Sequence, residues 1–504
     1  MSEGDNVQLR ERVHEKPSDD LVQRVNAPAL ARALQVAFEP QMQIHLAHTA
    51  MLARQGIIGQ SDARAILTVL VEIHRAGPTG LEIDHGLEDM YSHIERALIR
   101  RVGPEVGGRM HTGRSRNDLG VTTDRMVLRT NLLALLDDVL AFHQVLLDLA
   151  EAHIETVMPG LTHSQHAQII TLGYYFAAFA DVVSRDLARL EAAYGRVNRN
   201  PLGAAALTTT GFPLDRGMTT TLLGFDGLVE NAYDAIVSRD DVTEATAAVA
   251  TLMTNLSRLA EDLWIWSTLE FGYAELADRY CSVSSIMPQK KNPGVLEKIK
   301  AMSAQAIGDS MAAFAAVKNV SFSECGDAQT GGNLPLDAAI RLAITALDLF
   351  RGVLPSTTFR KERMRYLAEI GFATMTELAD TIVREKGMSF RMAHNVVGKT
   401  VARALEEGKT AIDLTTQMLD ESCQELFGHP LGLTQAALTQ ALDPWGNVCV
   451  RTVTGGPAPS EMARMLAGAA NRQQAAEARQ QQRRKHLAES KSQLDHEVGM
   501  AIGQ

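Results

Sequence analysis

Long stretches without proline are the feature of this sequence that most constrains its fold. The stretches 105–158, 214–287 and 294–334 contain no proline and are rich in Ala, Leu, Met, Glu and Arg. A proline inside a helix removes a hydrogen bond and clashes with the preceding turn, whereas these five residue types are strong helix formers or close to it. Long helices can therefore run through each stretch.

The apolar residues recur with the period of a helix. In 126–158 they are spaced three and four apart, and the segments 167–199, 239–276, 294–318 and 335–353 show the same pattern. Runs such as AQIITLGYYFAAFA are apolar nearly all round, so such helices must be buried on most sides. A helix of about 35 residues spans about 50 Å, longer than a compact domain is wide. The pattern predicts a helical bundle that other subunits complete.

Strand signals are weak, so we predict an all-α fold, with small hairpins possible near 207–222. From about 387 to 432 the pattern changes to shorter helices punctuated by Gly and Pro, which suggests a separate C-terminal helical domain. The segment after about 471 is polar and rich in Gln and Arg. We interpret it as an exposed helix or a partly ordered tail.

Composition excludes several classes of protein. The 504 residues contain 49 Lys and Arg against 60 Asp and Glu, a net charge of −11, which argues against a nucleic-acid binder or an anionic-membrane binder. Four scattered cysteines form no CxxC pair and fit a reducing cytoplasm. The N-terminus is polar where a signal peptide would be apolar, and no charge-free apolar run is long enough to span a bilayer. We expect a cytoplasmic protein without membrane contact.

Three polar segments are candidates for chemistry. The first is HTGRSRND at 111–118, which places a guanidinium, a hydroxyl and an amide just before a predicted long helix. An Arg fork and helix N-terminal amides suit a carboxylate. The alternative is a polar capping loop with solvated arginines.

The second segment is MPGLTHSQHAQ at 158–168, a turn that leads into an apolar helix. Polar groups crowded at the start of a buried helix need partners or a function. A histidine in such a place is more often a structural cap or a core residue than a catalytic one.

The third segment is SVSSIMPQKKNPGVLE at 282–297, where a serine pair, two lysines and an asparagine surround two prolines. Such a loop could close over a site, with a serine as proton acceptor and Lys and Asn holding an anion. The alternative is a solvated basic turn.

Together, in this order and at these separations, the three segments resemble the signature regions of the fumarase/aspartase superfamily, most closely its argininosuccinate lyase branch. The resemblance extends to EDMYSHIE at 88–95, PLGAAALTTTGFPLDR at 201–216, KGMSFRMAHNVVGKTVARALEEGK at 386–409 and VRTVTGGPAP at 450–459. Only about 30 residues at each end fall outside it.

The resemblance implies a three-domain fold with a central long-helix bundle. We divide the chain into an N-terminal helical domain at 1–113, a central five-helix domain at 114–365, a C-terminal helical domain at 366–472 and a polar tail at 473–504. It further implies a homotetramer with a twenty-helix core, in which each active site is shared among three subunits.

The implied reaction is a reversible carbon–nitrogen elimination that releases fumarate and an amine from an N-substituted aspartate, without a metal or organic cofactor. By match to the family motif, Ser284 is the base, and Lys290 and Asn292 stabilise the carbanion charge. His163, paired with Glu297, helps deliver a proton to the departing nitrogen. The same match assigns substrate binding to Ser115, Arg116, Asn117, Thr162 and Gln329, and less firmly to Arg239.

The departures from the argininosuccinate lyase pattern fall mainly on the side that would hold the amine. The family's residues are replaced at Ile44, His45, Tyr91, His166, Val283, Glu324, Cys325 and Gly332. Two readings follow: a divergent argininosuccinate lyase of arginine biosynthesis, or a relative that accepts another amine. Glu324 favours a cationic amine, as in lyases of aminopolycarboxylic acids such as ethylenediaminedisuccinate, and this is the reading we prefer. A non-catalytic, crystallin-like scaffold is the alternative from another class.

Overall fold

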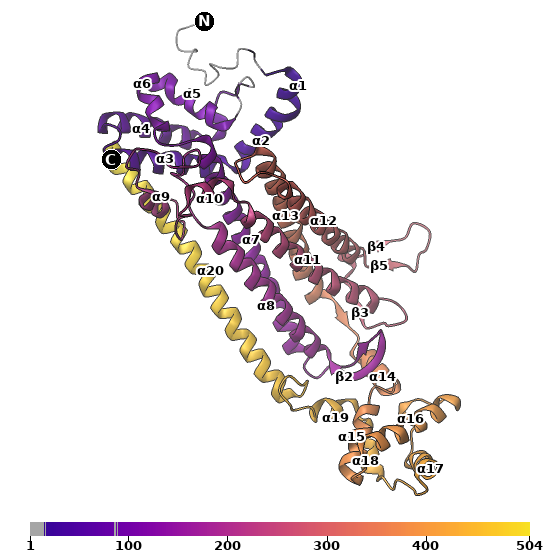
Figure 1. Ribbon diagram of the computed structural model, residues 1–504. Helices are drawn as coiled ribbons and strands as arrows, with labels where there is room; N and C mark the ends of the chain where they lie inside the picture. The colour runs from indigo at the N-terminus through magenta and orange to yellow at the C-terminus, as the bar shows by residue number, and fades with distance from the viewer. Residues whose placement is uncertain (1–14, 16, 85–86, 88, 504) are drawn as a thin grey trace.

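The structure is a computed structural model that describes residues 15, 17–84, 87 and 89–503 (Figure 1). The first 14 residues of the predicted N-terminal domain, and Glu88 of the EDMYSHIE motif, lie outside the described residues. The molecule is elongated, with the N-terminal helices at one end of a long bundle and a group of short helices at the other.

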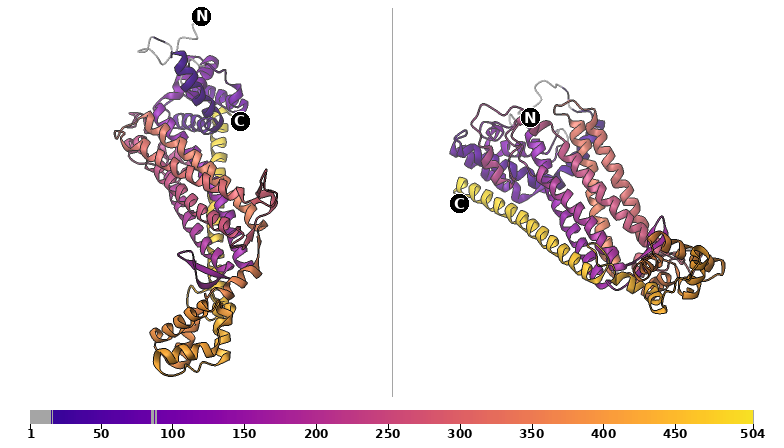
Figure 2. Two further views of the ribbon diagram at one scale, coloured as in Figure 1. Left: turned by 90° about the vertical axis from the view of Figure 1, so that its right-hand side faces the viewer. Right: turned by 60° about the horizontal axis from the view of Figure 1, so that its bottom comes forward.

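Five long helices form the bundle and lie side by side (Figures 1 and 2). They are α7 (Arg116–Ala152), α8 (Leu172–Val197), α11 (Asp240–Trp266), α12 (Gly294–Lys318) and α13 (Gly326–Ser356). Their facing sides make one apolar core of fully buried side chains that include Leu136, Phe142, Leu252 and Phe350. The prediction of a mainly helical fold built on long, buried helices is confirmed.

Helix ends differ from the predicted segments where local chemistry overrides the apolar pattern. The helix predicted over 126–158 begins ten residues earlier, because Ser115 caps α7, and it ends at Ala152. The helix predicted from 335 begins at Gly326, so Pro335 lies inside α13. The residue four before this proline, whose carbonyl the ring faces, is Gly331, and its adaptable backbone eases the fit.

The N-terminal helices pack on a second apolar core at the upper end of the bundle, as drawn in Figure 1. They are α2 (Ala27–Val36), α3 (Phe38–Arg54), α4 (Gln60–Ala76), α5 (Met90–Val102) and α6 (Pro104–Gly107), with the later short helices α9 (Arg216–Leu222) and α10 (Ala232–Val237) close by. Before α2 come α1 (Asp19–Leu21) and a π-helical turn (Val22–Asn26), which contribute no side chain to this core.

The short C-terminal helices form a third apolar core at the lower end of the bundle. The helices of this core are α15 (Met375–Lys386), α16 (Phe390–Glu406), α17 (Thr416–Phe427) and α18 (Gln435–Leu442). Two further short helices, α14 (Lys361–Ile370) and α19 (Pro444–Cys449), pack instead against residues 157–171.

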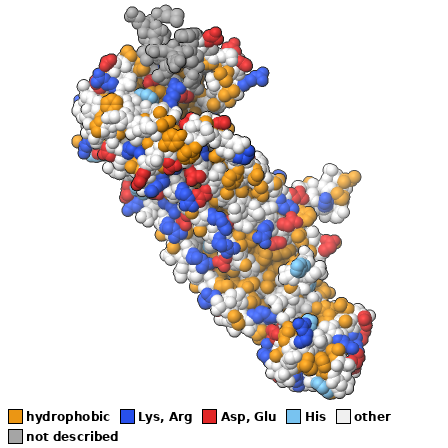
Figure 3. All heavy atoms as spheres, viewed as in Figure 1, with side chains coloured by type: hydrophobic (Ala, Val, Ile, Leu, Met, Phe, Trp, Pro, Cys, Tyr) orange, Lys and Arg blue, Asp and Glu red, His pale blue; other side chains and the backbone are white. Residues whose placement is uncertain are grey.

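The final helix, α20 (Pro459–Ile502), runs back along the bundle to α3 and α4 (Figure 1). Buried Gln473 and Gln480 donate to α7 backbone carbonyls at 3.1 and 2.8 Å. Arginines on α20 pair with Asp137, Asp181 and Glu191, and Figure 3 shows Lys and Arg atoms along this edge. The predicted polar tail is therefore a helix with one buried face, and the boundary placed at residue 472 falls inside it. Its polar side chains make hydrogen bonds and ion pairs with α7 and α8, and others face solvent.

Three short antiparallel pairs are the strands of the described chain. They are β1 (Val157–Thr162) with β2 (Gln165–Thr171), β3 (Ala274–Glu275) with β6 (Thr358–Phe359), and β4 (Ser282–Val283) with β5 (Lys291–Asn292). The hairpin considered possible near 207–222 is not there. That expectation was wrong, because Asp215 accepts a hydrogen bond from the Met218 amide and starts α9 instead.

No described helix is both long enough and apolar enough to cross a membrane.

Replacing Phe350 by alanine should destabilise the bundle strongly. The ring is fully buried, 5.7 Å from that of Phe142, so truncation removes apolar contacts and leaves a cavity. We expect the free energy of unfolding to fall by about 3–5 kcal/mol. The measurement is the urea midpoint by circular dichroism. Phe212→Ala, at a ring that is half exposed, is the matched control and should shift the midpoint little. Equal shifts would contradict the assignment of the core.

Candidate active site

The first predicted segment forms the start of α7, and a capping box holds it. The Ser115 Oγ accepts from the Asn117 amide at 3.2 Å, and the Asp118 carboxylate accepts from the Ser115 amide at 2.9 Å. The other Asp118 oxygen accepts from the amides of Gly203 and Ala205, each at 3.0 Å. Asp118 thus ties the helix start to the loop after α8. Ser115 and Asn117 are held at a helix N-terminus, where backbone amides attract anions.

Arginine side chains concentrate positive charge next to the N-terminus of α7. Arg114 is buried, and its guanidinium carbon lies 6.0 Å from the ring of Tyr91. The Tyr91 hydroxyl donates to Glu95 at 2.5 Å. Burial, together with the charge of Arg114, lowers the pKa values of His45 and His48 well below the usual range, so both rings are neutral near pH 7. The arginines therefore carry the positive charge here.

Arg116, predicted to grip a substrate carboxylate, is held from α5. Its Nη2 donates to the Ser92 hydroxyl at 3.0 Å, and its Nη1 lies 3.4 Å from the Asp89 carboxylate. Its guanidinium carbon lies 5.7 Å from the centre of the Tyr91 ring. Tyr91, which stands where the family has histidine, thus lies close to two arginines, and burial raises the pKa of its hydroxyl.

The second segment is the tip of the β1–β2 hairpin. Thr162 pairs with Gln165, so His163 and Ser164 form a two-residue turn. Both have positive φ, 51° and 60°, which is the left-handed region that suits Asn and Gly best. Thr162, His163 and Ser164 are exposed. Consecutive non-glycine residues held in this region store backbone strain, a feature that clusters at functional sites.

The third segment is the β4–β5 hairpin, which projects from the side of the bundle (Figures 1 and 2). The Ser284 Oγ accepts hydrogen bonds from the backbone amides of Met287 at 3.0 Å and Ile286 at 3.4 Å. Lys291 is committed to Asp278 at 2.7 Å and Glu275 at 3.3 Å. The side chain of Lys290 is exposed.

One chain does not bring the three segments together. The first lies at the N-terminus of α7 and the second just beyond its C-terminus, and a 37-residue helix is about 55 Å long. Asn292 ends the third segment's hairpin, and Glu297 lies exposed in the first turn of α12. Within the described chain, His163 and Glu297 make no hydrogen bond or ion pair with each other.

Arg239 and Glu324 face each other near the start of α11. The Arg239 Nη1 donates to the carbonyls of Ile236 and Ser238 at 3.0 and 2.7 Å, and its Nη2 lies 3.9 Å from the Glu324 carboxylate. Arg239 is buried. The predicted amine-binding carboxylate of Glu324 therefore already has a cationic neighbour.

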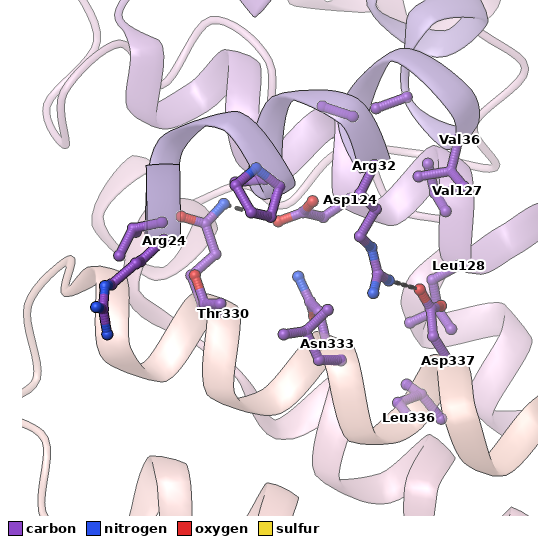
Figure 4. A pocket seen from close by; sticks show the side chains of 17 residues that line it. Arg24, Arg32, Val36, Asp124, Val127, Leu128, Thr330, Asn333, Leu336 and Asp337 are labelled. Carbon is purple, nitrogen blue, oxygen red and sulfur yellow. Dashed lines mark hydrogen bonds and ion pairs between the residues drawn. The ribbon is translucent and has the colours of Figure 1, made fainter. Parts of the chain in front are cut away.

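Gln329 lines an open pocket of about 640 Å³ between α13, α7 and the segment formed by the π-helical turn and α2 (Figure 4). Its Nε2 donates to the Asp124 carboxylate at 2.7 Å. The polar lining also includes Arg24, Arg32, Thr330, Asn333 and Asp337, and the remaining walls are mostly apolar. Among the described residues, no group of three His, Cys, Asp or Glu side chains is placed to hold a metal ion.

Comparison with known proteins identifies the family. A lyase family model matches residues 15–308, and an argininosuccinate lyase C-terminal model matches 372–448. The argininosuccinate lyase of Methanocaldococcus jannaschii is 40% identical over 429 residues, 85% of this chain and 87% of its own length. That of Methanosarcina barkeri is 42% identical over 432 residues, 85% of this chain and 86% of its own. The chain is an argininosuccinate lyase-like member of the fumarase/aspartase superfamily.

Solved structures agree with this placement. An EDDS lyase in complex with formate matches this argininosuccinate lyase-like chain with a TM-score of 0.85, at 34% identity over 97% of each chain. A class II fumarase from Schistosoma mansoni, with a TM-score of 0.65 and 16% identity over 83% of this chain and 94% of its own, shares the fold. The predicted superfamily is confirmed, and the protein is a carbon–nitrogen lyase of this family.

Sequence reasoning missed the cavity residues that surround Gln329 in this argininosuccinate lyase-like chain. Asp124 follows Asn117 by seven residues, two helical turns along the same face of α7, and this spacing was the available signal. Arg24 and Arg32 come from a segment outside the resemblance or at its margin, so no motif pointed to them.

The strained hairpin turn predicts a position-specific response in stability. Ser164→Val should lower the free energy of unfolding by about 1–3 kcal/mol, because a β-branched residue resists positive φ. Ser164→Gly, which adopts this conformation freely, should keep or raise the urea midpoint. Unchanged midpoints in both variants would show that the turn carries no strain.

Proposed function

We propose that this protein eliminates an amine from an N-substituted aspartate and releases fumarate, with Ser284 as the base. The observation that carries the proposal is the environment of the Ser284 Oγ, which accepts hydrogen bonds from two backbone amides. A serine hydroxyl is a poor base unless its alkoxide is stabilised, and amide donors provide such stabilisation. An EDDS lyase variant with bound fumarate, 33% identical over 97% of each chain, supports fumarate as the product.

In the proposed reaction, the Ser284 alkoxide takes the proton from the carbon next to a substrate carboxylate. The electron pair forms the carbon–carbon double bond as the carbon–nitrogen bond breaks, and the departing nitrogen accepts a proton delivered with the help of His163 and Glu297. Lys290 and Asn292 stabilise the charge that develops on the carboxylate. Lys290 suits this role better than Lys291, whose ammonium is already paired with two carboxylates.

We further propose that the active site is shared among three subunits of a homotetramer. Three parts of a site that lie at opposite ends and on the side of one bundle can meet only across chains. The β4–β5 hairpin exposes Val283 and Ile286, 88% and 83% accessible, and α12 exposes Met311 and Phe314. Figure 3 shows hydrophobic side chains on this side of the molecule. Such exposed apolar surface favours association.

The dicarboxylate part of the substrate is assigned to Ser115, Arg116, Asn117 and Thr162, with Gln329 and Arg239 near the amine part. The amine is either that of argininosuccinate, as in the curated relatives, or that of an aminopolycarboxylic acid, as in the EDDS lyase. The three-domain division and a cytoplasmic location remain part of this proposal.

Ser284→Ala should abolish fumarate release. Loss of a general base typically costs about 100- to 10,000-fold in rate. The measurement follows the ultraviolet absorbance of fumarate while the protein is offered argininosuccinate, ethylenediaminedisuccinate, adenylosuccinate and aspartate in turn. Ser285→Ala, whose hydroxyl makes no such amide contacts in the described hairpin, is the matched control and should lose less than about tenfold. A larger loss from Ser285→Ala than from Ser284→Ala would reassign the base.

Two inactive variants should restore each other if subunits share sites. Dissociating and reassembling equal amounts of Ser284→Ala and His163→Ala should recover about a quarter of wild-type activity, because random mixing leaves that share of sites with both side chains intact. The control mixes Ser284→Ala with Lys290→Ala, whose defects fall on the same segment, and should recover nothing. Recovery in neither mixture, with mixed oligomers verified by mass, would mean that Ser284 and His163 of one site come from the same subunit.

A further inference from the structure

The cavity beside Gln329 lies along α7 from the proposed carboxylate-binding residues. Asn117 and Asp124 are seven residues apart on one helix, so the cavity begins about 10 Å from the helix start. The Gln329 side chain lies against α7 between Asn117 and Asp124. Its Nε2 lies 3.2 Å from the position that a Cβ on Gly120 would occupy, so glycine there makes the close approach possible. A substrate bound by its succinyl end at Asn117 would extend its amine toward Asp124.

Asp124 presents a carboxylate that is held only by neutral groups. It accepts hydrogen bonds from the amides of Gln329, at 2.7 Å, and Asn333. No Lys or Arg in the described chain lies within ion-pair distance of it, although the charge of Arg239 acts from further away. Burial raises its pKa to about 6, against the lowering effect of those neighbours, so it is largely ionised at pH 7. A partly buried carboxylate without a counter-ion favours a cationic ligand.

Arg24 offers the complementary charge. Figure 4 shows it beside Thr330, with no hydrogen bond or ion pair to the other residues drawn. Arg32, the other arginine of the cavity, is paired with Asp337. The other lining residues, among them Pro28, Ala29 and Leu334, are mostly apolar and suit the aliphatic chain of an amine.

We propose that this cavity binds the leaving amine and that Asp124 and Arg24 determine its specificity, Asp124 holding an ammonium and Arg24 a carboxylate at the far end of an aliphatic amine. The inference rests on the proposed function, since it takes Ser115, Arg116 and Asn117 as the succinyl site. It assigns the cationic end of the amine to Asp124 rather than to Glu324, whose carboxylate already faces Arg239.

Four matched amines test the proposal. They are ornithine; 5-aminopentanoate, which lacks the far ammonium; 1,4-diaminobutane, which lacks the carboxylate; and 1-aminobutane, which lacks both. Their dissociation constants are measured by titration calorimetry on the full-length protein in saturating fumarate. We expect ornithine to bind tightest and each missing group to weaken binding about tenfold or more, as for hydrogen bonds to charged groups.

The variants separate the two charges. Asp124→Asn should erase the difference between ornithine and 5-aminopentanoate and keep the preference for the carboxylate. Arg24→Gln should erase the difference between ornithine and 1,4-diaminobutane and keep the preference for the ammonium. Asp348→Asn, at an exposed carboxylate on α13 outside the cavity, should change neither. Because the Arg24 side chain is exposed, Arg24→Gln tests the carboxylate half even if Asp124→Asn does not fold.

Four amines that bind wild-type protein within about threefold of one another, or an Asp124→Asn variant that weakens all four equally, would overturn the proposal. The binding measurement needs no turnover. A protein that ranks the amines as expected but releases no fumarate from any substrate would therefore contradict the proposed lyase function and leave the cavity assignment standing.

Discussion

The length of α7 is the constraint on which the rest of the structure depends. Its 37 residues are buried along most of their course by contacts with α8, α13 and α20. Unpartnered polar groups cannot be placed in such a core without a large desolvation cost. The polar segments therefore lie where the helix begins and just after it ends. A helix long enough to build the bundle necessarily separates these segments, and this separation is the basis for proposing a site shared between chains.

Each polar segment is held in place by a different local device. The first depends on a capping box and on Asp118, which accepts hydrogen bonds from three backbone amides. The second depends on a hairpin whose turn residues, His163 and Ser164, adopt left-handed conformations. The third is a short hairpin anchored at its base by the ion pairs of Lys291. In all three, the side chains with proposed roles are at least partly exposed, which is compatible with the proposed sharing of sites between subunits.

Helix period and proline placement predicted the bundle because long apolar periodicity reports burial directly. The same signals failed where polar chemistry decides the outcome. Pro335 does not end a helix, since Gly331 allows the backbone to adapt, and the polar stretch after 472 is packed because Gln473 and Gln480 bond to α7 carbonyls. The motif segments led to predicted roles for their residues, and these roles stay predictions. Their separation in space was expected as well, because a long helix was predicted between the first two segments and the resemblance implied a site shared among three subunits.

The amine side of the site shows why residue type alone does not decide a role. Glu324 and Asp124 are both carboxylates near Gln329, and sequence comparison drew attention to Glu324 because it replaces a family residue. In the fold, Glu324 faces the buried guanidinium of Arg239, whereas Asp124 is held by the amides of Gln329 and Asn333. A ligand cation at Glu324 would have to compete with an arginine already present, but at Asp124 it would supply the missing counter-ion. The partner already present at each carboxylate thus determines which of them is available to a substrate.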